Sequence, residues 1–266
     1  MDGKSKAGIK VHTLLKADNN MPCFIKFTAA AIDDQQFYEC IKELPNHSII
    51  TFDKAYINHE QFDKFNDRGI SHVVPQKDNA QYTSIKELDL LDTETDTLKD
   101  EIIEIKYTVE NEKVQAKKQL QLRRIAYYSP KHKDTFIYWT NNMELTATEI
   151  VSIYQNRWQI EKFFKKLKQN FPLQYFLGDN ANAIEIQIWC ALIGLILMQV
   201  IFTEQKATMA FSILASIVSI HLMNYTCITS IINRYKQKRQ RKRNQQPENF
   251  TIKRIVHPHI QKQFDF

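Results

Sequence analysis

Short apolar runs separated by polar turns make up the first part of the chain. Residues 8–15 (GIKVHTLL) and 21–29 (MPCFIKFTA) are two such runs, and the Asp-Asn-Asn segment at 18–20 predicts a turn between them. Residues 47–52 and 70–74 are shorter runs of the kind that form buried strands. The pattern therefore predicts a hairpin followed by two further strands.

Helical segments alternate with these strands. A helix that begins at Asp33 or Asp34, either of which is a suitable N-cap, is expected to end before residue 45. Residues 58–66 predict a second helix with two phenylalanines on one face, which ends at Gly69. Strand, helix, strand, helix, strand is the order of a mixed α/β domain.

The middle of the chain has a different pattern. Residues 85–112 are acidic and contain DTETDT, which predicts a loop or spacer. Residues 102–109, 120–128 and 135–139 have the composition of antiparallel strands. We therefore predict a β-rich insertion at 79–141.

The last part of the chain is predicted to be helical. Thr146 with Glu149 three residues later forms a capping box, the start of a long helix that Pro172 ends. Further helices are predicted at 180–203 and 208–232. The four expected parts of the chain are a first core segment, the insertion, a helical part that completes the core, and a basic tail, at 1–78, 79–141, 142–235 and 236–266.

Two apolar stretches, 188–202 and 210–223, raise the question of a membrane span. The first has about 15 residues, short of the roughly 20 that cross a bilayer. The second contains three serines and a histidine. Buried core helices are therefore the favoured interpretation, and a membrane-associated helical protein is the alternative.

Composition excludes several classes of protein. Hydrophobic residues make up 43% of the chain, which argues against disorder. Five glycines, with neither GxGxxG nor GxxxxGK[ST], argue against a nucleotide-phosphate cradle. The four cysteines lack zinc-site spacing, and the start of the chain lacks an apolar signal core. A reduced cytoplasmic protein is the simplest interpretation.

Positive charge is concentrated near the end of the chain. The net charge is +6, and one short run alone supplies seven positive charges. Such an arm suits a polyanion such as DNA, although a solvated tail without a partner is equally compatible with the pattern. The residues are Arg234, Lys236, Lys238, Arg239, Arg241, Lys242 and Arg243.

One helical segment carries a stripe of chemically active side chains. At about 100° per residue, Tyr154, Arg157, Glu161 and Lys168 lie within about 60° of one another. An ordinary surface pair between Glu161 and Lys165 accounts for the spacing equally well. Three apolar residues fall outside the stripe and are expected in the core: Trp158, Phe164 and Leu167.

The stripe fits phosphoryl transfer to DNA. That chemistry uses two divalent metals about 3.5–4 Å apart, held by acidic residues. Glu161 would be one metal ligand, Arg157 and Lys168 would contact phosphates, and Tyr154 would donate a hydrogen bond to one. Asp53 follows a predicted strand, where a second ligand is expected in an open α/β sheet.

These motifs resemble a known family. The spacing Tyr-x2-Arg-x3-Glu-x6-Lys, complete here, resembles the signature of bacterial insertion-sequence transposases with a DDE catalytic site. Residues 50–56 (ITFDKAY) resemble the family block around its second aspartate, and residues 8–12 (GIKVH) the block before it. The resemblance covers roughly residues 7–200.

The resemblance implies an α/β, RNase H-like catalytic core with a β-rich insertion and a C-terminal helical part. It implies Mg²⁺-dependent hydrolysis and strand transfer on double-stranded DNA, at transposon ends and target, by a homodimer in the bacterial cytoplasm and nucleoid. Asp53 and Glu161 correspond to two of the family's three metal-binding carboxylates. Arg157 and Lys168 correspond to residues that contact DNA near the cut.

The sequence departs from the family at the first aspartate. Asp2 is too near the chain start to lie on a core strand, Asp18 is at a hairpin tip, and Asp33 and Asp34 suit a turn or cap. We therefore predict that the first carboxylate and its strand are missing, as in a truncated copy. A site with two carboxylates should position Mg²⁺ poorly and give little activity.

Two other functions, and more than one role for several residues, are compatible with the sequence. A non-catalytic nucleic-acid-binding protein and an RNase H-like nuclease without strand transfer both fit the residues. His12 is expected to be structural, and Lys54 and Tyr56 suit either a turn or a phosphate contact. Three aromatic residues of the insertion are expected to pack in the sheet rather than stack on a base: Tyr127, Tyr128 and Trp139.

Overall fold

The computed structural model divides the chain into two compact units. Unit 1 is Met1–Lys168 with Leu173–Ile188, and unit 2 is Gln169–Pro172 with Trp189–Phe266. Asp2, Asp33 and the tail beyond residue 244 lie outside the described residues. Those described are 9–32, 34–42, 44–90, 96–111, 114–173, 175–178, 180–204, 209–221, 223–224 and 227–244.

The predicted N-terminal hairpin is confirmed. Strands β1 (Ile9–Leu15) and β2 (Pro22–Ala29) pair antiparallel, and Asn20 in the turn adopts a positive φ of 55°. Asparagine tolerates this conformation better than most residues. The hairpin forms a sheet of its own and packs through Leu14 and Phe24 on the main core of unit 1.

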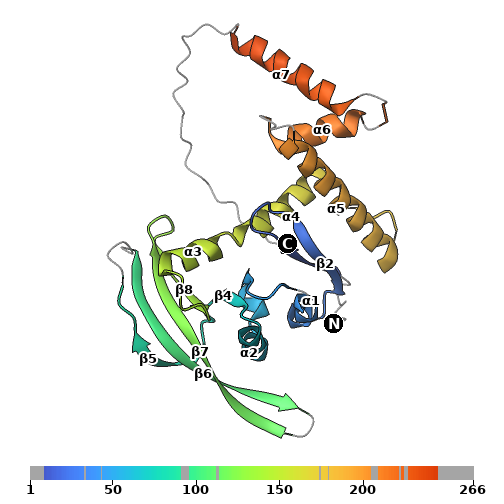
Figure 1. The fold of residues 1–266 in the computed structure, drawn as a ribbon. Helices are drawn as coiled ribbons and strands as arrows, with labels where there is room; N and C mark the ends of the chain where they lie inside the picture. Colours follow the sequence, from blue (N-terminus) through green and yellow to red (C-terminus); the bar gives the residue numbers. More distant parts are fainter. Residues whose placement is uncertain are drawn as a thin grey trace, which may run out of the picture. The chain divides into compact units, whose positions relative to one another are not determined.

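A mixed sheet of six strands forms the centre of unit 1. Its order is β3-β4-β8-β7-β6-β5, with β3 and β4 parallel and the other pairs antiparallel. Because β8 pairs with β4, the predicted insertion continues the sheet of the core, and β6 and β7 extend it as a long twisted hairpin (Figure 1). The strands are β3 (Ile49–Thr51), β4 (Ser71–Pro75), β5 (Thr83–Glu87), β6 (Thr97–Asn111), β7 (Val114–Ser129) and β8 (Asp134–Thr140).

The prediction of a loop or spacer over 85–112 was wrong. β5 and β6 occupy most of that stretch, with residues 91–95 outside the described part. Asp100 and Glu101 belong to this acidic stretch, yet both are buried in β6. Arginines on β7 pair with them, so the acidic composition reflects charge pairing inside the sheet.

The sheet is covered on both faces, because side chains alternate along each strand. On one face, Phe62 and Phe65 of α2 (His59–Asp67) pack into the main core, as predicted. Trp139 of β8 is 1% exposed on this face, which confirms sheet packing for that residue. The other face carries α3 (Ala147–Gln155), which packs on β4, β7 and β8.

Gly69 ends α2 as predicted. Its φ is +62°, and its N–H donates to the carbonyl of Asn66 at 3.0 Å. A Cβ at this position would lie 2.7 Å from the Nδ1 atom of His47. The left-handed backbone conformation and this close approach both favour glycine here.

The helix predicted from Asp33 or Asp34 to residue 44 is shorter than expected. A 3₁₀ turn, η1 (Asp34–Phe37), leads into one turn of α-helix, α1 (Tyr38–Ile41). Phe37, Tyr38 and Ile41 are all buried in the main core. Packing of these side chains stabilises a segment too short to be a stable helix alone.

The single helix predicted from Thr146 to Pro172 is two helices. α3 ends at Gln155 and α4 (Trp158–Asn170) begins after a turn at Asn156 and Arg157. Phe163 and Leu167 of α4 are buried, whereas Trp158 is 56% exposed. Trp158, the first residue of α4, was therefore wrongly expected in the core.

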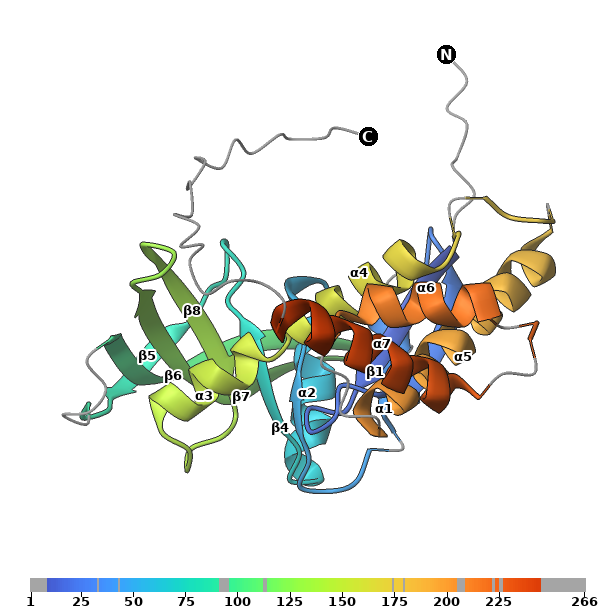
Figure 2. The same cartoon turned by 90° about the horizontal axis from the view of Figure 1, so that it is seen from above.

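Three helices follow, two of them entirely in unit 2. α5 (Ala181–Glu204) confirms the predicted helix at 180–203, while the helix predicted at 208–232 is two, α6 (Phe211–His221) and α7 (Ile228–Asn244). α6 and α7 pack together around Leu214 and Ile232 (Figure 2).

α5 is more exposed than predicted. It has 24 residues, and in its most apolar window 28% of the residues are buried. Ile193 and Leu197 are 54% and 59% exposed. The prediction that this apolar stretch is too short to cross a membrane was therefore wrong: by length and composition alone α5 could do so, a test that core helices of soluble proteins also pass.

Candidate active site

Asp53 lies where the sequence predicts it, at the carboxyl end of a strand. β3 ends at Thr51, Phe52 still donates to Val73 of β4, and Asp53 caps the 3₁₀ turn η2 (Lys54–Tyr56). One carboxylate oxygen accepts from the N–H of Lys54 at 2.8 Å. The side chain is 57% exposed, so its other oxygen is accessible from solvent.

Tyr56 and His12 fix the turn that carries Asp53. The Tyr56 hydroxyl is hydrogen-bonded to Nδ1 of His12 at 2.9 Å, and Nε2 of His12 to the Thr28 hydroxyl at 2.8 Å. Tyr38 donates its hydroxyl to the Tyr56 carbonyl. His12 is 3% exposed, which confirms its structural role, and Tyr56 likewise has a structural role here.

Lys54 points to a different carboxylate. Its ammonium forms an ion pair with Asp78 at 2.8 Å between two exposed side chains. Such pairs contribute little to stability. The structure therefore gives Lys54 a surface contact, and a phosphate contact for it stays a prediction.

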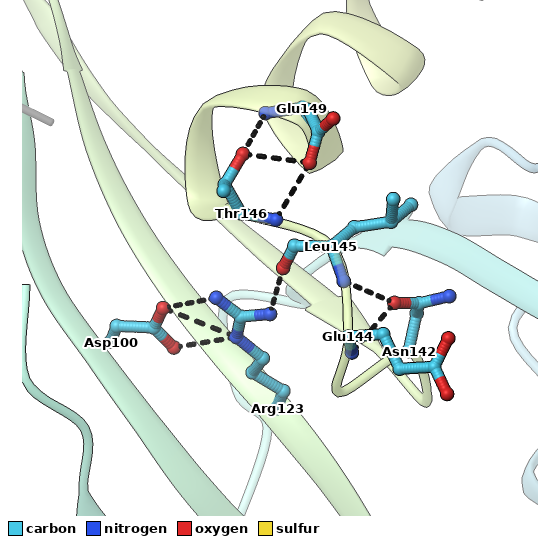
Figure 3. A network of polar contacts seen from close by, with 7 residues as sticks. All are labelled: Asp100, Arg123, Asn142, Glu144, Leu145, Thr146 and Glu149. Carbon is cyan, nitrogen blue, oxygen red and sulfur yellow. Dashed lines mark hydrogen bonds and ion pairs between the residues drawn. The ribbon is translucent and has the colours of Figure 1, made fainter. Parts of the chain in front are cut away.

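A polar network fixes the start of the helix that leads to Glu161. The predicted capping box is present: the Thr146 hydroxyl accepts from the Glu149 N–H at 3.3 Å, and the Glu149 carboxylate accepts from the Thr146 N–H at 2.9 Å. The Asn142 side chain accepts from the N–H of Leu145 at 2.8 Å. Figure 3 shows this network continuing from Leu145 into the sheet.

A buried ion pair anchors that network. Arg123 of β7 donates from Nε and Nη2 to the Asp100 carboxylate of β6 at 2.9 and 2.6 Å, and from Nη1 to the Leu145 carbonyl (Figure 3). The two charged side chains are 7% and 3% exposed. This pair was not predicted from the sequence, although acidic residues at 100–101 and arginines at 123–124 in neighbouring apolar runs were a usable signal.

Asp53 and Glu161 both form ion pairs with the guanidinium of Arg157. Arg157 lies in the turn between α3 and α4, with Nη1 3.6 Å from Asp53 Oδ2 and Nη2 3.1 Å from Glu161 Oε1. Its side chain is 21% exposed, against 57% and 43% for the two carboxylates. The structure thus brings the two carboxylates to different nitrogens of one guanidinium, one from the turn after β3 and one from α4.

Tyr154 joins this group, and Lys168 lies farther along α4. The Arg157 guanidinium lies over the Tyr154 ring at 5.5 Å, and the same ring packs against Tyr138 at 4.7 Å. Burial raises the pKa of Tyr154, so its hydroxyl keeps its proton and remains a donor. Lys168 is exposed two helical turns beyond Glu161, on the same helix.

A third carboxylate does not join them within the described part of the chain. There, no three His, Cys, Asp or Glu side chains are grouped in a way that could hold a metal ion. Asp18 is exposed in the hairpin turn, and Asp34 forms an ion pair with Lys10 at 3.2 Å. Asp18 thus has the turn position that the sequence predicts, whereas Asp34 begins η1 and pairs with a lysine of β1.

The sequence model of the transposase DDE domain matches residues 2–197. The chain belongs to this family. The mixed α/β sheet with helices on both faces agrees with the RNase H-like core that the resemblance implies. Family membership thus confirms the resemblance, while the individual roles of the signature residues stay predictions.

Two proteins described as transposases are similar in sequence to this chain. It is 26% identical over 202 residues to a protein described as transposase y4zB of Sinorhizobium fredii, covering 76% of this chain and 56% of that protein. It is 24% identical over 202 residues to a protein described as the transposase of insertion sequence element IS5377 of Geobacillus stearothermophilus, covering 76% and 51%. The chain spans about half the length of the curated relatives it matches.

Proposed function

We propose that this chain is the catalytic part of a transposase, which cleaves double-stranded DNA at transposon ends and joins it to a target with a divalent metal. The observation that supports this most directly is that Asp53 and Glu161 both lie within ion-pair distance of Arg157. Asp53 follows β3 and Glu161 lies in the first turn of α4, and both elements have residues buried in the unit. The family of the chain is the second support.

The two carboxylates fit a hard divalent cation, and we propose Mg²⁺. Carboxylate oxygens are the protein ligands that Mg²⁺ prefers, and it often takes only one or two of them together with water and substrate phosphates. Asp53 and Glu161 are both partly exposed, so water and a phosphate have access to them. With two carboxylates in place of three, we expect weak metal binding in the absence of DNA.

The chain's own residues would then bind and orient the DNA. The metal, when bound, would activate the attacking oxygen and stabilise the leaving oxygen. Arg157 and Lys168 would hold the phosphates on either side of the scissile bond, and the protonated Tyr154 hydroxyl would donate to another. The DNA-bound homodimer that the family resemblance implies, working in the bacterial cytoplasm, is part of the same proposal.

The first prediction is that Glu161→Gln separates DNA binding from catalysis. The variant keeps the shape of the side chain but removes a metal ligand, so Mg²⁺-dependent cleavage of the transposon ends should fall by at least about 100-fold. Binding of the same DNA should be unchanged. A strand-cleavage assay and a gel-shift assay on one DNA substrate measure the two effects.

The outcomes of this test separate the alternatives. Cleavage that persists in Glu161→Gln would contradict the proposed site. Metal-dependent nicking without joined products would favour a nuclease, and binding without any metal-dependent reaction a non-catalytic DNA-binding protein. We expect low activity from the chain alone, and strong cleavage would place a third carboxylate outside the described residues.

The second prediction concerns the basic end of α7. The seven cations between residues 234 and 243 lie on or close to one helix, with no acidic residue among residues 228–244. Arg234, Lys238 and Arg241 are exposed and fall on one face at helical spacing. We propose that this face contacts DNA phosphates.

Changing these three residues to glutamine should lower the salt dependence of DNA binding. Each lost phosphate contact reduces the slope of log Kd against log salt by about 0.9, so a total fall of roughly 2–3 is expected. A matched control changes three exposed lysines of the insertion, Lys86, Lys117 and Lys131, to glutamine. Equal falls in both triple variants would contradict a specific role for α7.

A further inference from the structure

Arg157 is held from three sides at the proposed metal site. Asp53 and Glu161 lie 3.6 and 3.1 Å from its two terminal nitrogens, and the Tyr154 ring faces its guanidinium carbon at 5.5 Å. Its Nε atom is buried without a hydrogen-bond partner in the described part of the chain. In this arrangement the guanidinium faces carboxylates of its own chain, although it is the residue proposed to contact a DNA phosphate.

The position of the guanidinium is where a metal ion would have to bind. Two carboxylates close to one another repel, and a cation between them offsets the repulsion. A divalent ion that binds both would have the same carboxylates as its ligands. Because the ion and the guanidinium repel each other and share these partners, they cannot both occupy the position.

We infer that Arg157 is a placeholder cation, which holds Asp53 and Glu161 together before metal binding and is displaced towards the DNA phosphate when the metal enters. This inference rests on the proposed function. The displacement breaks two partly exposed ion pairs, which are weak. It also gives Nε, unpartnered among the described residues, an acceptor among the phosphate oxygens.

The location of Arg157 in a turn suits this movement. The backbone N–H of Arg157 donates to Tyr154 at 2.9 Å, and its carbonyl accepts from Ile160 at 3.1 Å. These backbone hydrogen bonds hold the turn between α3 and α4 in place while the Arg157 side chain changes direction. The turn between α3 and α4 thus allows the proposed movement of Arg157. The sequence pattern predicted one continuous helix and so did not predict this turn.

A purely structural clamp makes the opposite prediction. If Arg157 served only to position the two carboxylates, its removal would let them separate and would weaken metal binding. If it is a placeholder, its removal takes away a competing cation and tightens metal binding. The sign of the change in metal affinity therefore decides between the two.

The experiment is a titration of the purified chain with Mn²⁺, a spectroscopic substitute for Mg²⁺, followed by electron paramagnetic resonance without DNA. Arg157→Gln is expected to bind Mn²⁺ about three- to tenfold more tightly than the wild-type chain. Arg157→Lys keeps the charge and should stay close to wild type. The matched control is Lys162→Gln, which removes one exposed charge from the residue after Glu161 on another side of α4 and should change affinity by less than about twofold.

Glu161→Gln distinguishes failure of the inference from failure of the proposed function. If it abolishes Mn²⁺ binding and Arg157→Gln tightens binding, the inference is supported. If it abolishes binding while Arg157→Gln weakens binding or leaves it unchanged, the inference is overturned and the proposed function stands. If Mn²⁺ binding does not depend on Glu161, both are overturned. Gel-shift assays should show weaker DNA binding by Arg157→Gln, a change opposite in direction to its metal affinity.

Discussion

Replacing Asp100 with alanine is expected to lower the free energy of unfolding by roughly 3–5 kcal/mol, because it leaves a buried arginine without its counter-ion. Arg123 and Asp100 are 7% and 3% exposed and share a two-pronged contact inside the sheet. Chemical denaturation followed by circular dichroism measures the change. The expected loss is a large part of the stability of an ordinary domain.

Two controls test the reason for this loss. Glu60→Ala removes an exposed partner of Lys64 on α2 and should change the free energy of unfolding by less than about 0.5 kcal/mol. Replacing Asp100 and Arg123 together by leucine and methionine removes both charges and should recover most of the stability. A double variant as unstable as Asp100→Ala would show that the pair matters for something other than charge burial.

The same ion pair connects the sheet to the proposed active site. Arg123 also donates to the carbonyl of Leu145, the residue before the Thr146 cap of α3 (Figure 3). α3 leads directly into the turn that carries Arg157. Loss of the pair is therefore expected to disturb the position of Glu161 as well as the stability of the sheet.

Acid is expected to destabilise the chain through His72. This side chain is fully buried on β4, stacked on Phe62 at 3.9 Å, and its two ring nitrogens have no hydrogen-bond partner among the described residues. Burial, with a smaller contribution from His59, lowers the pKa of His72 from 6.5 to about 3. Below its ordinary pKa the unfolded chain therefore binds a proton that the folded chain does not.

The direction in which the free energy of unfolding changes with pH follows from this difference in proton binding. Stability is fully present above pH 6.5 and is lost as the pH falls from there towards about 3. The expected loss from His72 alone between about pH 7 and pH 4.5 is roughly 2.5 kcal/mol. His72→Phe keeps an aromatic ring but cannot take a proton, so its free energy of unfolding should fall less over the same range. Urea denaturation at a series of pH values measures both chains.

An exposed histidine gives the matched control. His132 lies in the turn between β7 and β8 and is exposed, so His132→Phe should keep the acid sensitivity of the wild-type chain. His59 is partly buried, and burial also lowers its pKa, so a smaller acid dependence should remain in His72→Phe. Unchanged acid sensitivity in His72→Phe would assign the effect to other groups.

Local sequence patterns predicted most of the elements of the fold. The β1–β2 hairpin, the two phenylalanines of α2, the glycine that ends it and the capping box of α3 are all present. Each depends on backbone periodicity or on a side chain that caps its own segment, and such features lie within a few residues of one another. The family was likewise accessible from three short blocks of residues.

The errors share a physical cause. The acidic stretch at 85–112 was expected to be a loop or spacer. The arginines at 123–124 that pair with Asp100 and Glu101 are on another strand, and only the register of β6 with β7 brings them together. The helix through residue 157 was expected to be continuous, because the apolar periodicity carries no mark of the turn. α5 was expected to be a buried core helix, yet Ile193 and Leu197 on it are more than half exposed.

The sequence by itself determined the candidates for chemistry at this site: a carboxylate after a strand and a carboxylate among cations on a helix. The tertiary structure decided that Asp53 and Glu161 meet, and that Arg157 lies between them. Periodicity fixes which side of an element a residue faces, whereas distance between elements depends on sheet pairing and helix packing across the whole chain. Pairing of β3 with β4, and packing of α3 on the opposite sheet face from α2, set that distance here.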